Sequence, residues 1–515
     1  MLWNKKFKKS VLILFSGLIF ASCGEKSTLN ENSTELKNNE NQKFKTLSDF
    51  EGKKIAVSVG TTGADALIEK FKSVEVTYAN TSPDLIMLLE TSKVDAIAVT
   101  DGVSKNVLKE KPNFRIFPES YGSSEAGFIF KKGSPLKKDF DEVLQKMKDS
   151  GQVQKIIEKW TGNDEDLKVV PEQTWDGKNG TYNYYTEAFY EPYSYIKNEK
   201  VVGIDADLLL HIARELDVKV NIYNVDFTAI LPAVQGGKGD IGGGGLSITE
   251  ERAKTVDFST PYTGGKYVFM YKENSANQRK DFFDSLQKSF HRNFITENRW
   301  KLLLNGFVVS IFISIASLIL GLLIGFLICL LRRSNNKLGN KFAFLFIKIM
   351  QGMPIVVFLM ILYYVVFAKV NISGILVSII GFGLNFAAYS CEIMRSGLDS
   401  IETGQSEAAL ALGYTKMQSF WKVVFPQASQ RFIPVLKGQF ISMVKETSIV
   451  GYIAVQDLTK VSDIIRSRTL EAFFPLISTA IIYFVMANLL TMFLTKFEAS
   501  IDPKRRKNIL KGVKK

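Results

Sequence analysis

A glycine-rich segment, residues 236–252 (GGKGDIGGGGLSITEER), combines groups that can bind a small anion. Glycines allow backbone amides to approach a ligand closely, and the side chains of Ser247 and Arg252 can donate further hydrogen bonds. In a phosphate-binding P-loop, the glycines end in a lysine that is followed by Ser or Thr. Lys238 instead precedes the long glycine cluster, so the segment predicts a small-anion site that is not a P-loop.

The elements that position this segment are predicted to be α/β layers. From about residue 44 to 274, β-rich runs such as 53–59 (KKIAVSV) and 95–100 (DAIAVT) alternate with helical stretches such as 205–217 (DADLLLHIARELD). Such alternation is typical of layered α/β domains. The glycine cluster follows a short strand and precedes a helix that begins near Thr249, whose N-terminal amides add donors for an anion.

The second half of the chain is predicted to cross a membrane. Residues 302–331 contain no charged side chain, and at about 1.5 Å per residue they exceed a hydrocarbon core of about 30 Å. Four more apolar runs follow, at 343–368, 371–392, 432–455 and 473–495. We therefore expect an all-α membrane domain of five transmembrane helices.

Positive charge predicts the direction of these helices. The chain contains 65 Lys and Arg against 52 Asp and Glu, a formal net charge of +13. Many of the cations flank apolar spans, and the tail after residue 500 is strongly basic. Because Lys and Arg collect on the cytoplasmic side, we expect a cytoplasmic C-terminus, and we attribute the excess to topology and lipid headgroups rather than to nucleic-acid binding.

The N-terminus has the pattern of a secretory signal, with a basic start, an apolar run at 11–20 and small residues before Cys23. It resembles a bacterial lipoprotein signal, residues 1–23, which implies that Cys23 is lipidated and becomes the mature N-terminus. An uncleaved membrane anchor is the alternative. Residues 24–43 are polar and are expected to form a flexible tether. With either a signal or an anchor before it, the α/β region is expected to lie outside the cytoplasm.

Cysteine and histidine usage argues against metal and disulfide chemistry. Cys329 and Cys391 fall in apolar spans, so no disulfide is expected in the exported region. His211 and His291 are far apart and lack ligand spacing, so we expect no metal and no other cofactor. An enzyme is not supported either, because no nucleophile–base pair emerges.

A polar loop between the third and fourth predicted spans, residues 396–431, is expected to form a helix–turn–helix. The stretch from Glu407 to Leu412 favours a helix that Gly413 can end in a left-handed cap, and a second helix is expected to stop at Pro426. From composition alone, this loop would be a linker helix on the membrane surface.

The loop also contains a motif. Six residues match the EAA loop of ABC importer permeases at its full spacing: Glu407, Ala408, Ala409, Gly413, Phe425 and Pro426. Residues 301–500 as a whole resemble the polar amino-acid permeases. This resemblance implies that the EAA helix docks on a separate cytoplasmic ABC ATPase, and a two-sided pathway implies a second copy of the chain. Glu392, Lys445 and Glu446 are candidates for the substrate path or for pairing within the bundle.

The exported region resembles the polar amino-acid binding proteins, which are two-lobed, type II periplasmic-binding-protein-like α/β domains. Residues 166–274 resemble the first lobe and residues 44–165 resemble the second lobe, so their order is reversed. We expect one circularly permuted domain with a chain break at one hinge, near Lys272 and Phe44. Two half-domains completed by another chain are the alternative. Three segments complete the chain: a connector at 275–300, the permease domain at 301–500 and a basic tail at 501–515.

The resemblance implies a substrate site. A bound amino acid has a carboxylate and an ammonium, and both need charge-assisted partners when the lobes close. The expected site comprises Glu187, Tyr190, Phe227, Gly245, Ser247, Arg252, Thr61, Thr62 and Asp101. Arg252 would clamp the carboxylate with Ser247 and the backbone of Gly245. Thr62 would approach the same carboxylate from the other lobe.

Two aromatic residues, Tyr190 and Phe227, would sandwich the stem of the ligand between flat apolar faces. Without the resemblance, both would be interpreted as ordinary core residues. Arg252 would likewise be interpreted as part of a surface salt bridge.

Two positions bear on which amino acid is bound. The family commonly has an Asp that holds the ammonium where this chain has Thr100, and Asp101 lies one place further on. Glu187 occupies a position where an acid often meets the ligand's side chain, which favours a basic or an amide side chain.

These expectations combine into the membrane subunit of an ATP-driven ABC importer. Its exported domain would capture a small polar amino acid and pass it through the permease domain of the same chain. An amino-acid-gated channel or sensor is the alternative, but a channel would need a pore loop and no ATPase-docking loop.

Overall fold

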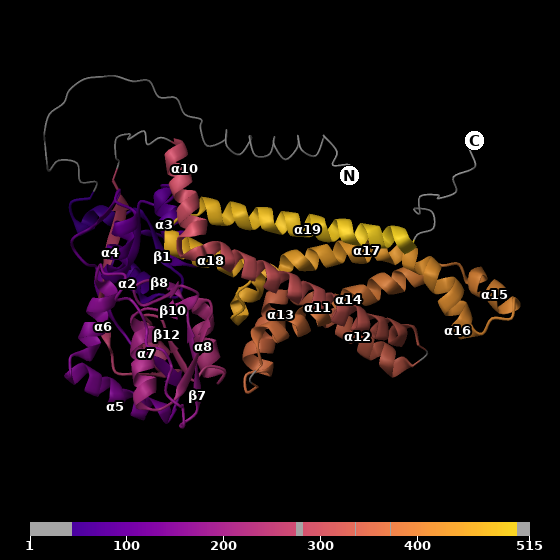
Figure 1. The fold of residues 1–515 in the computed structure, drawn as a ribbon, viewed down its shortest axis with the longest axis horizontal. Helices are drawn as coiled ribbons and strands as arrows, with labels where there is room; N and C mark the ends of the chain where they lie inside the picture. Colours follow the sequence, from indigo (N-terminus) through magenta and orange to yellow (C-terminus); the bar gives the residue numbers. More distant parts are fainter. Residues whose placement is uncertain (1–43, 274–281, 335, 371, 502–515) are drawn as a thin grey trace, which may run out of the picture. The chain divides into compact units, whose positions relative to one another are not determined.

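The computed structural model describes residues 44–273, 282–334, 336–370 and 372–501 (Figure 1). The predicted signal with Cys23, the tether at 24–43 and nearly all of the basic tail lie outside the described residues. Strands and helices alternate from Leu47 to Lys272, and only helices follow from Phe282 to Ile501. The predicted order of an α/β region and an all-α region is confirmed.

One sheet of the α/β region has six strands, in the order β2-β1-β3-β14-β4, with β5 also paired to β14. Its strands are β1 (Lys54–Ser58), β2 (Glu75–Ala79), β3 (Ala96–Thr100), β4 (Phe114–Ile116), β5 (Gly122–Ala126) and β14 (Thr263–Lys272). Strands β1, β2 and β3 are parallel, and helical crossovers join them. The helices are α2 (Thr62–Lys70), α3 (Ser82–Glu90) and α4 (Asp101–Glu110). We call this sheet and its helices the second lobe.

Another sheet has five strands, in the order β11-β7-β12-β6-β13. Its strands are β6 (Ile129–Lys131), β7 (Thr181–Thr186), β11 (Lys219–Asn224), β12 (Ile241–Gly243) and β13 (Val256–Phe258). Its helices are α5 (Leu136–Asp149), α6 (Gln152–Thr161), α7 (Ile204–Glu215), α8 (Phe227–Gln235) and α9 (Glu250–Ala253). A small sheet of β8 (Phe189–Tyr190), β9 (Ser194–Lys197) and β10 (Lys200–Val202) accompanies it. We call these elements the first lobe.

The two lobes have equivalent strand orders. Counted in chain order within a lobe, the second strand lies at one edge of the sheet, and the first and third strands follow it. Next comes a strand that enters from the other lobe, and the lobe's fourth strand lies beyond it. The entering strand is β14 in the second lobe and β6 in the first lobe. The chain therefore changes lobe twice, between Ala126 and Ile129 and between Phe258 and Thr263.

These crossings correct the predicted lobe boundaries. The sequence places the limit between lobes at residues 165 and 166, whereas β6 already belongs to the first lobe. The hinge break predicted near Lys272 and Phe44 is also wrong, because both crossings are continuous and Lys272 ends a strand within the second lobe. Alternating apolar residues identify a strand, but they do not indicate which sheet the strand joins.

Helices α5 and α6, which the predicted boundary assigns to the second lobe, pack in the apolar core of the first lobe instead. The indole N–H of Trp160, on α6, donates to Asp207 Oδ2 on α7 at 2.7 Å. Trp160 is fully buried, so this hydrogen bond provides its polar atom with a partner. The two helices therefore follow β6 into the lobe that this strand joins.

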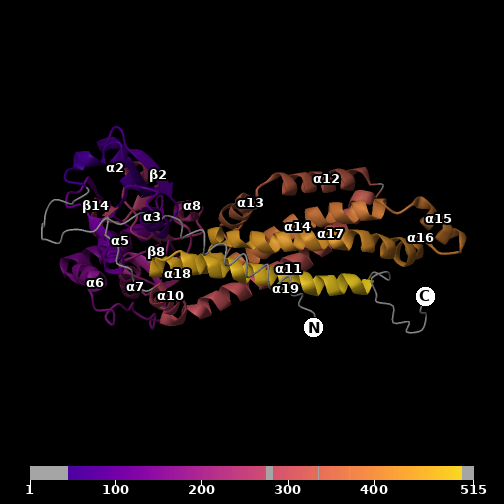
Figure 2. The same cartoon turned by 90° about the horizontal axis from the view of Figure 1, so that it is seen from above.

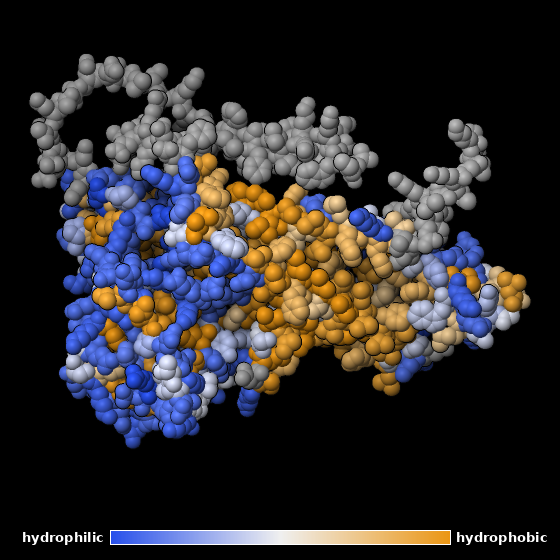
Figure 3. Space-filling model, viewed as in Figure 1, coloured by the Kyte–Doolittle hydropathy of each residue, from blue (hydrophilic) through white to orange (hydrophobic). Residues whose placement is uncertain are grey.

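The helical region contains several long helices that lie side by side in both views (Figures 1 and 2). Its helices are α10 (Phe282–Phe290), α11 (Arg299–Arg333), α12 (Lys337–Gly352), α13 (Ile355–Ile361), α14 (Gly374–Asp399), α15 (Thr403–Ala411), α16 (Lys416–Ser419), α17 (Phe425–Glu446), α18 (Leu458–Thr469) and α19 (Phe473–Ile501). Helix α14 packs against α11 and α17, and α17 packs against α19. Figure 3 shows a continuous hydrophobic surface over the long helices of this region and a mostly hydrophilic surface over the two lobes.

Three segments of the described chain are long and apolar enough to cross a membrane: 286–333, 374–399 and 473–499. The pair α12 and α13 passes the same test together but is bent by 108°, so the number is four if this pair is one span. The single helix predicted at 343–368 is therefore wrong. Met353 is extended before Pro354, as proline sterically requires, and the helix breaks there.

Helices α11 and α14 approach each other closely because small residues line their contact. A Cβ atom at Gly325 of α11 would lie 2.7 Å from the carbonyl oxygen of Ala387 on α14. A Cβ atom at Gly321 would lie 2.8 Å from the carbonyl oxygen of Gly383. Such contacts drive helix association where apolar side chains gain nothing by leaving lipid.

The polar loop after α14 forms the expected helix–turn–helix. Helix α15 ends before Gly413, whose φ of +85° is the predicted left-handed cap. The predicted stop at Pro426 is wrong, because this proline lies in the first turn of α17. A proline is tolerated there because the first amides of a helix have no intrahelical acceptor.

Asp205 holds the glycine-rich loop that follows β12. Its buried Oδ2 accepts hydrogen bonds from the N–H groups of Gly244 (2.7 Å) and Gly245 (3.1 Å), and its Oδ1 accepts one from the Tyr262 hydroxyl (2.7 Å). Gly244 and Gly245 have φ values of +117° and +70°, which favour glycine. The loop conformation therefore depends on glycines and on one buried carboxylate.

Replacing Asp205 with Ala should destabilise the α/β region. The change leaves buried donors without an acceptor, which costs about 3 kcal/mol in total. For a region of this size, the melting temperature should fall by roughly 6–12 °C. Thermal unfolding of the full chain in detergent, followed by tryptophan fluorescence, measures the shift. The exposed Glu142, replaced with Ala, is the control, and equal melting temperatures for both variants would contradict the role of Asp205.

Candidate functional site

Arg252 lies on α9 where the two lobes meet. Its Nη1 donates to the carbonyl oxygen of Ser247 at 2.9 Å, and its Nη2 donates to the carbonyl oxygen of Gly60 in the second lobe. The guanidinium carbon lies 5.8 Å from the centroid of the Phe227 ring, a cation–π distance. The lobes are therefore in contact around Arg252, whose guanidinium binds a backbone oxygen from each lobe.

Tyr267 is a central residue that the sequence did not single out. Its hydroxyl is hydrogen-bonded to Thr62 Oγ1 and lies 3.3 Å from Ser247 Oγ, so it links one predicted site residue from each lobe. Its ring stacks on Tyr121 with a centroid distance of 5.7 Å. The run KYVFMYK indicates a strand, but the place of this strand in the sheet of the second lobe follows only from the crossing at 258–263.

Tyr190 also lies in the contact between the lobes. Its ring stacks on Tyr193 at a centroid distance of 5.3 Å, and its hydroxyl is hydrogen-bonded to Thr100 Oγ1 of the second lobe at 2.9 Å. A Cβ atom at Gly245 would lie 3.1 Å from both tyrosine rings, so the absence of a side chain there allows the rings to pack. Tyr193 is a second residue that the sequence analysis missed.

Three predicted site residues have polar groups that are bonded within the protein. The N–H of Gly245 donates to Asp205 at 3.1 Å, and Thr61 Oγ1 donates to the carbonyl oxygen of Ser58 at 2.8 Å. Asp101 Oδ1 accepts a hydrogen bond from the N–H of Lys266 at 3.2 Å. A ligand carboxylate or ammonium would have to exchange these bonds, so the ligand-binding roles stay predictions.

Glu187 is a buried carboxyl group whose side chain lies next to α8. Its pKa is raised from 4.5 to about 7, mainly by burial; Lys460 and the N–H of Phe227 lower the pKa, and the carboxylates of Asp226 and Asp84 raise it. At neutral pH such a group presents either a negative charge or a proton to a neighbouring ligand group. Lys460 belongs to α18 of the helical region, so both parts of the chain contribute to this environment.

A cavity of about 330 Å³ adjoins Tyr190 and connects both lobes to the helical region. Its lining includes Phe189 and Tyr190 of the first lobe, Ile86 of the second lobe, Arg468 of α18 and Leu470. A volume of this order is at the small end of ligand-binding pockets. Space for a small solute therefore exists between the candidate site and the helices.

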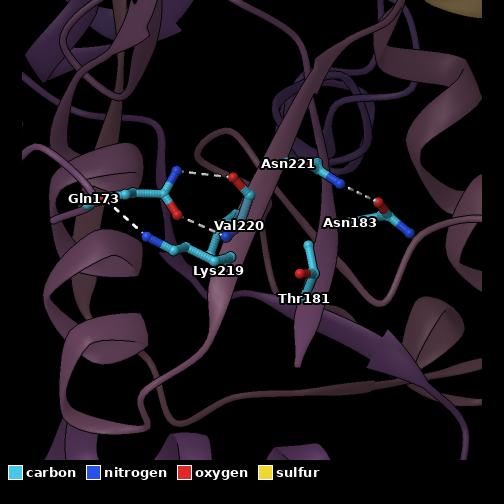
Figure 4. A pocket seen from close by; sticks show the side chains of 6 residues that line it. All are labelled: Gln173, Thr181, Asn183, Lys219, Val220 and Asn221. Atoms are coloured by element: carbon cyan, nitrogen blue, oxygen red, sulfur yellow. Dashed lines mark hydrogen bonds between the residues drawn. The ribbon is translucent and has the colours of Figure 1, made fainter. Parts of the chain in front are cut away.

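A more open pocket at the outer edge of β11 is not part of this site (Figure 4). Gln173 hydrogen-bonds both the N–H (2.7 Å) and the carbonyl oxygen (2.9 Å) of Val220, and its own carbonyl accepts from Lys219 Nζ at 2.9 Å. Asn221 donates to Asn183 Oδ1 at 3.2 Å. These polar groups are hydrogen-bonded to one another. The pocket is therefore the place where the segment before β7 is attached to the edge of the sheet.

The described residues contain no group of three or more His, Cys, Asp or Glu side chains with the geometry to hold a metal ion. Cys329 and Cys391 are buried free cysteines on α11 and α14. Glu392, a candidate for the substrate path, forms an ion pair with Arg395 on the same helix at 2.7 Å. Lys445 is exposed and Glu446 is half-buried at the end of α17.

The predicted ATPase-docking residues lie on α15 and in its cap. Glu407 and Ala408 are exposed, Ala409 is buried against the rest of the loop, and Gly413 forms the turn. Large apolar side chains are exposed around them: Leu410, Leu412, Tyr414, Met417 and Trp421. Exposed apolar side chains beside a charged residue are typical of a protein interaction site. In Figure 3 this end of the helical region shows hydrophobic residues among hydrophilic ones.

Two family models match the chain. Residues 182–361 match the bacterial extracellular solute-binding proteins, family 3. Residues 294–506 match the inner membrane component of binding-protein-dependent transport systems. The first match begins in β7, and the second begins just before α11.

Individual relatives agree with the second match. A putative glutamine transport system permease protein GlnP of Rickettsia typhi is 31% identical over 191 residues, which cover 37% of this chain and 88% of that protein. A probable amino-acid ABC transporter permease protein, YckA of Bacillus subtilis, is 34% identical over 191 residues, covering 37% and 84%. A crystal structure of an amino acid ABC transporter with histidines is 31% identical, covers 43% of this chain and 100% of that chain, and has a TM-score of 0.37. The chain belongs to the amino-acid ABC importer permeases and contains a solute-binding module in the same polypeptide.

Proposed function

We propose that the two lobes bind a polar amino acid outside the cytoplasm and deliver it to the permease helices of the same chain. The observation that carries this proposal is the meeting of the expected carboxylate-binding groups, because Arg252, Ser247 and Thr62 come from both lobes to one place. Glutamine is the first substrate to test, since several similar permeases are named for its transport. No comparison supports the amino-acid-gated channel or sensor.

The lobes form one circularly permuted, type II binding domain in this proposal. Its support is the equivalent strand order of the two sheets, each completed by a strand from the other lobe. In the unpermuted order, residues 166–258 would precede the segment at 44–126. The alternative of two half-domains would need a second chain to complete each lobe, whereas here each sheet is completed within the chain.

The membrane region has five spans in this proposal. Helix α17 would be the additional one, because its 22 residues extend about 33 Å and it packs between α14 and α19. With an exported start, five crossings lead to a cytoplasmic C-terminus and place α15 in the cytoplasm. The lipid-modified Cys23 would anchor the mature N-terminus on the exported side.

The partners of the chain would be a cytoplasmic ABC ATPase and a second copy of the chain. The exposed Glu407 and Ala408 with their apolar surroundings support the ATPase contact, and ATP hydrolysis belongs to that separate subunit. A homodimer would provide the second half of the permease pathway and would contain two binding domains. No nucleic acid and no cofactor are part of the proposal.

Arg252→Ala should weaken glutamine binding by about a hundredfold, because the ligand carboxylate loses its charged partner in a buried site. Calorimetry of the full chain in lipid nanodiscs measures the dissociation constant. Arg214→Ala, which removes an exposed arginine on α7, should change it less than threefold. Unchanged binding in the Arg252 variant would contradict the site, and no binding of any amino acid to the wild-type chain would contradict the function.

Glu407→Lys should abolish co-purification with the cognate ABC ATPase, because it reverses the charge on the exposed face of α15. The measurement is the amount of ATPase retained on the tagged, detergent-solubilised chain. Glu142→Lys makes the same charge change on α5 and should retain the ATPase. ATPase retention by both variants would show that α15 is not the docking helix.

The affinity for arginine should rise by about tenfold from pH 6 to pH 8. The pKa of Glu187 is about 7, so the ionised fraction of its carboxyl group increases by about this factor over the same range. Ionised Glu187 attracts a cationic ligand side chain, whereas the neutral side chain of glutamine should respond much less. Glu187→Gln should remove the pH dependence for arginine. A pH profile that survives this substitution would assign the titration to another group.

A further inference from the structure

Helix α18, from the permease part of the chain, contacts both lobes of the α/β region through ion pairs. Lys460 Nζ lies 2.5 Å from Asp226 Oδ1 of the first lobe, and Arg466 is paired with Asp84 of the second lobe. Further along, Arg468 Nη1 lies 2.5 Å from Glu191 Oε2. One helix thus binds carboxylates on both sides of the contact between the lobes.

Lys460 is the most deeply buried of these cations, with a side chain that is 4% exposed. Its ammonium lies 4.4 Å from the centroid of the Phe189 ring, and Asp226 is its paired carboxylate. A buried ammonium is strongly unfavourable without such partners. Contacts with Phe189 and Asp226 of the first lobe therefore fix the position of the Lys460 ammonium.

The acidic groups around Lys460 belong to the same place in the first lobe as the predicted ligand side-chain contact. Asp226 immediately precedes Phe227, the first residue of α8, and the backbone N–H of Phe227 lowers the pKa of the Glu187 carboxyl group. Lys460, Asp226 and Asp84 are charged groups that shift the pKa of Glu187. Asp84 is already paired with Arg466, so Lys460 is the nearby cation for Glu187 and Asp226 together.

We propose that Lys460 is a specificity-determining residue of the amino-acid site, whose ammonium occupies the place that a basic ligand side chain would need. This inference rests on the proposed function, in which Glu187 faces the ligand's side chain. Lys460 offsets the charge of Asp226, with which it is paired, and its ammonium would repel a second cation at short range. The site then accepts a neutral amide side chain, as in glutamine, in preference to arginine or lysine.

A simple docking role for Lys460 predicts something different. If its ion pair served only to hold the lobes on α18, its loss would change the affinities for glutamine and for arginine by the same factor. Arg468 provides the matched comparison, because it is on the same helix and is a mostly buried cation that is also paired with carboxylates. Its partners are Glu191 and Glu297, whereas Lys460 is paired with Asp226.

The test is calorimetry of the full chain in lipid nanodiscs at pH 8, with glutamine and arginine as the probes. Lys460→Gln should shift the preference toward arginine by about tenfold or more, because one close repulsive charge is removed and Glu187 is ionised at this pH. Lys460→Arg should keep the wild-type preference, and Arg468→Gln should leave the ratio of the two dissociation constants unchanged.

A second variant covers the case in which Lys460→Gln leaves Asp226 unpaired and the chain folds poorly. The double variant Lys460→Gln with Asp226→Asn replaces the ion pair with two neutral amides, and Glu187 should still favour arginine in it. A wild-type ratio in these variants, or an equal shift in Arg468→Gln, would overturn the inference while leaving amino-acid binding intact. If the wild-type chain bound neither amino acid, the proposed function itself would fail.

Discussion

Charged groups that leave water require partners, and this requirement connects the loop, the candidate site and the contact with the permease helices. Asp205 is buried and is held by two backbone amides and a tyrosine hydroxyl, so its charge orders the glycine-rich loop. Arg252 meets backbone oxygens from both lobes, and in doing so it connects them. Lys460 brings a cation from the helical region to carboxylates of the first lobe. At each place, one charged side chain joins two separate segments of the chain.

Glycines allow other groups to approach the backbone closely in two different parts of the chain. In the first lobe, Gly245 lets two tyrosine rings pack against the loop, and its positive φ turns its amide toward Asp205. In the helical region, Gly321 and Gly325 let α11 approach the backbone of α14. The first use shapes a polar site between lobes, and the second replaces a hydrophobic driving force that lipid does not provide.

Local patterns in the sequence were sufficient for much of the fold. The α/β alternation, the long apolar segments and the left-handed cap at Gly413 all follow from residue types within a few positions of each other, and the structure contains them. Contacts between distant segments were not accessible in this way. The lobe joined by β14, and hence the position of Tyr267, depends on strand pairing across more than a hundred residues. Pro354 was visible in the sequence, but the 108° bend at this break depends on how α13 packs.

The fusion of binding domain and permease changes what their contact has to achieve. A separate binding protein must find its permease by diffusion, so the affinity between them has to come from the docking surface itself. A covalent connection supplies a high effective concentration without any contact, and the docking surface then needs little affinity of its own. The ion pairs between α18 and the lobes can therefore be few and exchangeable. Under this condition a permease residue such as Lys460 is free to act on the ligand's surroundings, because holding the two parts together does not depend on it alone.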